Sequence, residues 1–159
     1  MDEKTLREFL SKCLDWHEAH ADWKQALAPL PLKQQGARPP GSAHSPWELL
    51  EHARIAQSDI LEFCRDAKHV SPAWPEGYWP QSPAPPDSEA WAKSAKAFQA
   101  DIRSLQDLVT DPKFELLAAI SHGSGQTLLR EILLVLDHNS YHLGQLVITR
   151  KLLGCWPEG

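Results

Sequence analysis

Residues 126–154 read QTLLREILLVLDHNSYHLGQLVITRKLLG and lie between Pro112 and Pro157 without a proline of their own. Proline breaks helix interiors because it lacks a backbone N–H and clashes with the preceding turn, so this stretch can form one long helix. We expect the helix to begin near Gln126 or Thr127 and to end at Gly154, a residue type that commonly terminates helices. Its first half is apolar nearly all round, which predicts the most buried helix of the fold.

Two clusters of proline, at residues 29–46 and 72–86, divide the rest of the chain into segments whose apolar residues recur every three or four positions. That spacing is typical of helices with one buried face. We therefore expect three further helices, from about Lys4 to Ala28, from Pro46 to about Arg65, and from Asp87 or Ser88 to just before Asp111. The second has the clearest start, because Ser45 can cap it and Glu48 completes a capping box.

These four helices predict an all-α fold, a four-helix bundle forming a single domain over residues 1–159. No segment alternates convincingly as a strand, although residues 114–120 suit a short extended piece. The connection from Asp66 to Pro86 is rich in proline and tryptophan and longer than the usual link between antiparallel helices. It is long enough to cross the bundle, which would make the second and third helices parallel.

Composition removes several classes of function. The chain has 16 basic and 21 acidic side chains, a net charge of -5, which argues against binding to nucleic acid or to anionic membranes. The amino-terminal residues do not resemble a secretory signal, and no apolar run approaches the length of a membrane span, so we expect a cytoplasmic protein. Three widely spaced cysteines fit neither a disulfide framework nor a zinc motif.

Three of the eight histidines occupy positions that predict a metal site. His138 and His142 are four residues apart, so they project from one helix face a turn apart. His52 lies in the apolar stripe of the second expected helix, which faces the bundle interior. Three imidazoles from two facing helices, with a coordination position left open, are typical of a catalytic metal site rather than a structural one.

Each of these residues also has a simpler interpretation. Buried histidines often serve only as hydrogen-bonding core residues, and Glu48 can cap its helix or accept a bond from His52. Gln145 can bond a water near His142 or simply link two helices. The other five histidines are expected to be solvated, structural or loop residues. Three of them can also line a cavity at the metal site: His17 and His20 on the first expected helix, and His122 in the turn before the fourth. His44 and His69 are assigned to loops.

Three blocks of sequence resemble the DinB-like family of helical-bundle metalloproteins. They are SPWELLEH at residues 45–52 continuing through AQSDIL at 56–61, GYWP at 77–80 with Trp91, and GQTLLRE at 125–131 continuing through DHNSYHLGQ at 137–145. In that family one histidine of the second helix and an HxxxH pair of the fourth bind a divalent metal. The resemblance thus implies His52, His138 and His142 as ligands, zinc or nickel as the ion, and a homodimer.

The resemblance and the residues together suggest a metal-dependent enzyme whose ion activates a low-molecular-weight thiol or a water. Some relatives are thiol-dependent transferases, and both thiol transfer and hydrolysis need only a nucleophile of lowered pKa. Two alternatives remain open. One is a non-catalytic module that binds a metal or small molecule in a stress response, and the other is a structural dimer whose histidines have no metal role.

Overall fold

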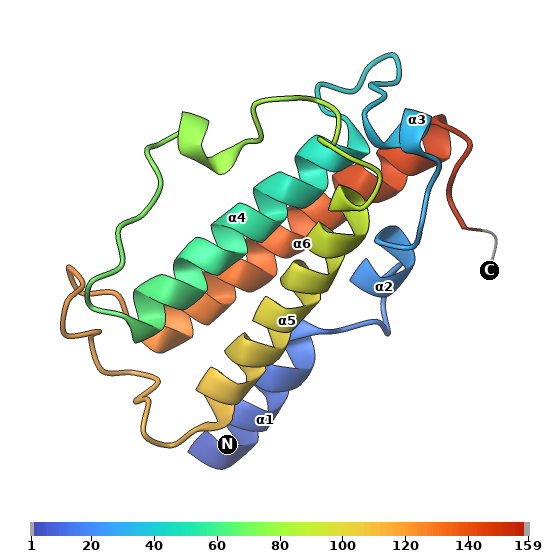
Figure 1. Cartoon of the computed structure of the whole chain (residues 1–159). Helices are drawn as coiled ribbons and strands as arrows, with labels where there is room; N and C mark the ends of the chain where they lie inside the picture. Colours follow the sequence, from blue (N-terminus) through green and yellow to red (C-terminus); the bar gives the residue numbers. More distant parts are fainter. Residues whose placement is uncertain (1, 158–159) are drawn as a thin grey trace.

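The computed structural model describes residues 2–157, in which every regular element is a helix. The expected all-α class is confirmed. Met1 and residues 158–159 of the expected 1–159 domain lie outside the described part. The elements are α1 (Glu3–Leu14), α2 (Trp23–Ala26), α3 (Leu32–Gln35), α4 (Pro46–Arg65), the 3-10 helix η1 (Glu76–Tyr78), α5 (Ala90–Thr110) and α6 (Leu128–Leu152) (Figure 1).

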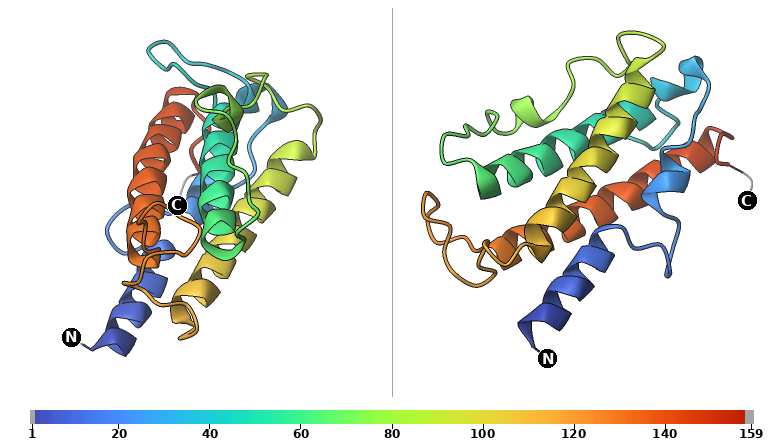
Figure 2. Two further views of the ribbon diagram at one scale, coloured as in Figure 1. Left: turned by 90° about the vertical axis from the view of Figure 1, so that its left-hand side faces the viewer. Right: turned by 60° about the horizontal axis from the view of Figure 1, so that its bottom comes forward.

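The four long helices pack side by side. Helix α4 contacts both α5 and α6, and α1 contacts the same two helices. Helices α4 and α5 run in one direction and α6 runs in the other (Figure 1). Residues 66–89 make this possible by returning along the outside of α4 to the end where that helix begins (Figure 2). The long connection therefore has the crossing role that its length predicts.

The prediction of a first helix from about Lys4 to Ala28 is wrong for its second half. Helix α1 ends at Leu14, and a new capping box starts α2, in which the Asp22 side chain accepts from the Gln25 backbone N–H and Gln25 bonds back to Asp22. Residues 15–22 form a loop, and α2 starts afresh at Asp22 because the capping box gives partners to backbone N–H groups at the helix start. His17 and His20 consequently lie in this loop.

The expectation that residues 126–154 form the most buried helix is also wrong. Buried residues make up 10 of the 25 in α6 but 12 of the 20 in α4. Leu133 and Leu134 of α6 are exposed. Helix α4 is the better enclosed because α5, α6 and the returning connection all lie against it. None of the described helices is long and apolar enough to span a membrane.

Candidate metal centre

His52, His138 and His142 come together where α4 lies against α6. The Nε2 atoms of His52 and His138 are 3.1 Å apart, and one nitrogen from each of the three rings lies within 4.8 Å of the others. The ring centroid of His142 lies 4.4 Å from that of His52 and 4.4 Å from that of His138. The described residues contain no other such cluster of histidine, cysteine and carboxylate groups.

Two hydrogen bonds select which ring nitrogen faces the centre of the cluster. His52 Nδ1 lies 2.9 Å from the backbone oxygen of Tyr78, and His142 Nδ1 lies 2.8 Å from Oε1 of Gln145. Because these oxygens can only accept, each Nδ1 carries the proton and each Nε2 keeps its lone pair. A carbonyl that holds the outer imidazole nitrogen is a recurrent feature of histidine metal sites.

Burial keeps the three imidazoles neutral. It lowers the pKa of His138 to about 4 and that of His142 to about 3, with the neighbouring imidazoles adding to both shifts. Burial also lowers the pKa of His52, although the hydrogen bond to the Tyr78 carbonyl opposes this shift. Neutral imidazoles at pH 7 offer their lone pairs to a cation without first losing a proton.

The donor set fits a divalent transition metal. Two imidazole nitrogens that bind one zinc ion at about 2.0–2.1 Å in tetrahedral geometry lie about 3.3 Å apart. The His52–His138 separation of 3.1 Å is close to this value. Imidazole suits zinc, nickel, copper and iron, so three such nitrogens can hold any of these ions.

An aromatic stack covers one side of the cluster. The Trp79 ring is parallel to His52 at 3.9 Å between centroids, and His44 stacks on Trp79 at 4.1 Å. His44 and His52 cannot both stack on one face of the indole at these distances, so Trp79 lies between them. His44 lies in a loop as predicted, but nothing in the sequence indicated its stacking on Trp79 except its position one residue before the Ser45 cap.

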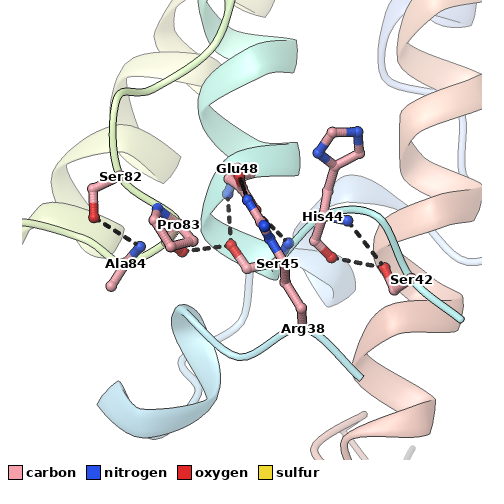
Figure 3. A network of polar contacts seen from close by, with 8 residues as sticks. All are labelled: Arg38, Ser42, His44, Ser45, Glu48, Ser82, Pro83 and Ala84. Atoms are coloured by element: carbon pink, nitrogen blue, oxygen red, sulfur yellow. Dashed lines mark hydrogen bonds and ion pairs between the residues drawn. The ribbon is translucent and has the colours of Figure 1, made fainter. Parts of the chain in front are cut away.

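Contacts at the start of α4 hold His44 in place. The Ser45 hydroxyl donates to the Pro83 carbonyl at 2.5 Å, and the Ser42 hydroxyl donates to the carbonyl of His44 at 2.7 Å (Figure 3). Glu48 accepts from the Ser45 backbone N–H and from Arg38, both at 2.8 Å. The capping role of Glu48 is thus confirmed, and its alternative role as a partner of His52 is wrong.

The other candidate residues fall into two groups. Gln145 binds His142 itself, which neither of its expected roles included. His17, His20 and His122 are exposed, and each bonds a backbone carbonyl outside the cluster. His69, which like His44 was assigned to a loop, has its Nε2 2.6 Å from Asp59 Oδ1.

A groove of about 270 Å³ opens beside the cluster. Its walls include His44 and Gln145, which contact Trp79 and His142 respectively. The rest of its lining is mostly apolar and comes from the loop before α4, from Leu49 in α4, and from Ile148 and Leu152 in the last turns of α6. A small molecule in this groove would lie next to the residues that position His52 and His142.

Comparison with known families places the cluster in context. Residues 15–146 match the family model described as the DinB superfamily, a range that contains all three histidines, the aromatic stack and the Tyr78 carbonyl. No curated protein and no solved structure matched the chain in the corresponding comparisons.

Proposed function

The chain belongs to the DinB superfamily, and from this premise we propose that His52, His138 and His142 bind one divalent metal ion, zinc or nickel. The observation that carries the proposal is the pair of Nε2 atoms 3.1 Å apart, with the outer nitrogen of His52 already bonded to a carbonyl. Without an ion, the two Nε2 atoms of His52 and His138 would share a single proton between them. A cation would use both lone pairs.

The proposed function is that of a metal-dependent enzyme acting on a small molecule. A divalent ion at this site would lower the pKa of a bound thiol or water enough to make it a nucleophile at neutral pH. Within residues 2–157 no carboxylate hydrogen bonds to the three histidines, and the ion itself would supply the activation of the nucleophile. This favours a low-molecular-weight thiol over water, because a thiol needs less help to lose its proton.

Metal content tests the first step. Protein purified without chelators should contain about one equivalent of zinc or nickel by elemental analysis. His138→Ala should lose it, because removing one of three ligands leaves a two-nitrogen site. His122→Ala, which removes an exposed histidine outside the cluster, is the matched control and should keep the metal. Negligible metal in the wild type, with no change in His138→Ala, would refute the site.

A non-catalytic metal-binding module is the second candidate, and the position of Trp79 favours it, since its indole lies flat on one of the three rings. Incubating metal-loaded protein with a panel of electrophiles, with and without low-molecular-weight thiols, separates the two. Thiol-dependent turnover that disappears in His138→Ala supports the enzyme. Full metal occupancy with no turnover of any electrophile supports the module.

We further propose that the protein is cytoplasmic. We also propose that its partner is a second copy of the same chain, because the family resemblance implies a homodimer. The outer face of α6 supports the dimer. Leu134, Tyr141 and Ile148 recur there every seven residues and are exposed. A side chain added at Gly144, between them, would meet no atom within 4 Å. A second helix can therefore approach this face closely.

A further inference from the structure

Asp59 holds two residues of the connection between α4 and α5. Its Oδ2 accepts a hydrogen bond of 2.7 Å from the Tyr78 hydroxyl, and its Oδ1 lies 2.6 Å from His69 Nε2. Asp59 is seven residues after His52 on α4, so the two side chains lie on the same helix face two turns apart. We call this three-residue contact the Asp59 clamp.

The clamp and the metal centre share one residue, Tyr78. The Tyr78 side chain ends on Asp59, while its backbone oxygen accepts the proton of His52 Nδ1 at 2.9 Å. The next residue, Trp79, places its indole flat against the His52 ring. Tyr78 and Trp79 thus supply both the hydrogen-bond partner and the cover of His52, and the phenol of Tyr78 ties them to α4.

Besides the clamp, this segment is held by the Trp79 stack and by short-range backbone bonds, such as the one from the Gly77 N–H to the Ala73 oxygen at 2.7 Å. The only regular element between α4 and α5 is η1, which is three residues long. Its residues 76 and 77 are exposed, and Trp74 is 77% exposed. A carbonyl in such a segment keeps its direction only if nearby contacts fix it, because short 3-10 turns have weak internal bonds.

From these contacts we propose that Asp59 is a positioning residue for His52. By binding Tyr78 and His69, it fixes the carbonyl that keeps the proton of His52 on Nδ1, so that Nε2 faces His138 and His142. Without the clamp only the Trp79 stack and local backbone bonds restrain the Tyr78 carbonyl, so it can turn away more often and the His52 ring can rotate or take the other tautomer. The role in metal affinity rests on the proposed function, whereas the role in the His52 tautomer does not.

Cobalt(II) binding, followed by visible absorption, tests the proposal with the metal alone as the probe. Tyr78→Phe removes one oxygen and keeps the ring, and we expect it to raise the cobalt Kd about tenfold, the lower range for losing support of a ligand histidine. Asp59→Ala should do the same. Asp59→Asn, which can still accept from the phenol, should stay within about threefold of the wild type. Tyr141→Phe is the matched control, because Tyr141 is 64% exposed beside His142, and it should bind as the wild type does.

The double variant separates positioning from general weakening. If Asp59 and Tyr78 act through one contact, Asp59→Ala with Tyr78→Phe should bind cobalt no more weakly than Asp59→Ala alone. Effects that multiply in the double variant, or a Tyr78→Phe variant with wild-type Kd, would overturn the clamp.

A metal-free measurement keeps the two proposals apart. Long-range ¹H–¹⁵N NMR of the metal-free protein should show His52 as a single tautomer protonated at Nδ1, and Tyr78→Phe should show a mixture. A wild type that fails to bind cobalt would overturn the metal site but leave this readout in force. An unchanged single tautomer in Tyr78→Phe would overturn the clamp even if metal binds.

Discussion

His142 has the most altered environment of the three clustered histidines. It is 6% exposed, and burial and the imidazoles of His138 and His52 lower its pKa to about 3. An unfolded histidine has a pKa near 6.5. Between these values the unfolded chain binds a proton that the folded protein does not, so the free energy of unfolding must fall as the pH falls from about 6.5 toward 3.

This difference predicts the pH dependence of the metal-free protein. Between pH 7 and pH 5, with a chelator present, the free energy of unfolding of the wild type should fall further than that of His142→Gln, by on the order of 1 kcal/mol. Urea denaturation at several pH values measures it. His17→Gln, which removes an exposed loop histidine, should follow the wild type. Parallel curves for wild type and His142→Gln would show that His142 is not held neutral by the fold.

Residue spacing predicted the three clustered histidines but not the groups that orient them. Positions 138 and 142 lie on one helix face in any α-helix, and His52 lies in an apolar stripe, so local geometry sufficed. The partner of His52 is a backbone oxygen 26 residues away in an irregular connection. Backbone oxygens have no sequence signature, and no periodic pattern predicts where such a segment returns.

At the scale of elements, the capped helices were predicted best. Helix α4 begins and ends where Ser45, Pro46 and Arg65 indicate, and α6 begins after the Thr127 cap. Gly154 follows α6 with a φ of +64°, a conformation that glycine adopts without strain. Helix α1 was predicted too long because apolar residues keep a helical spacing past Leu14, although Asp22 and Gln25 form the capping box of a separate helix.

The connection between α4 and α5 predicts a measurable role for Trp79. Trp79→Ala removes the indole that covers the His52 ring and leaves all three proposed ligands unchanged. We expect metal content to stay near that of the wild type, while a chelator strips the metal about tenfold faster, because the covered side of the site becomes accessible.

The rate of metal loss to excess chelator, read by a colorimetric indicator, is the measurement. Trp74→Ala, in the same connection but 77% exposed, is the control and should exchange metal at the wild-type rate. Loss of metal on purification of Trp79→Ala, equal to that of His138→Ala, would mean that the indole is part of the structural core rather than a cover.

At the scale of the whole molecule, the outer face of α6 carries a row of exposed apolar side chains. Tyr141 and Ile148 are 64% and 60% exposed two helical turns apart. If this face forms the proposed dimer, Ile148→Lys should place an ammonium group among apolar side chains and raise the dimer Kd about tenfold or more, since burying an unpaired charge costs more than the ~1.4 kcal/mol of a tenfold change.

Light scattering across a range of protein concentrations measures this shift. Val70→Lys, at an 85% exposed position in the connection after α4, should leave the dimer unchanged. A wild type that is monomeric at every concentration would refute the dimer, and equal dimerisation of wild type and Ile148→Lys would exclude this face as its interface.

The sequence by itself determined the all-α class, the bounds of α4 and α6, the crossing connection, and which three histidines cluster. These features depend on caps, prolines and helical spacing, which act within a few residues of one another. The tertiary structure alone decided which ring nitrogens face the centre, that Trp79 lies between His44 and His52, and that Asp59 holds Tyr78. These contacts join segments distant along the chain. They depend on where the connection between α4 and α5 returns, which is a property of the packed molecule.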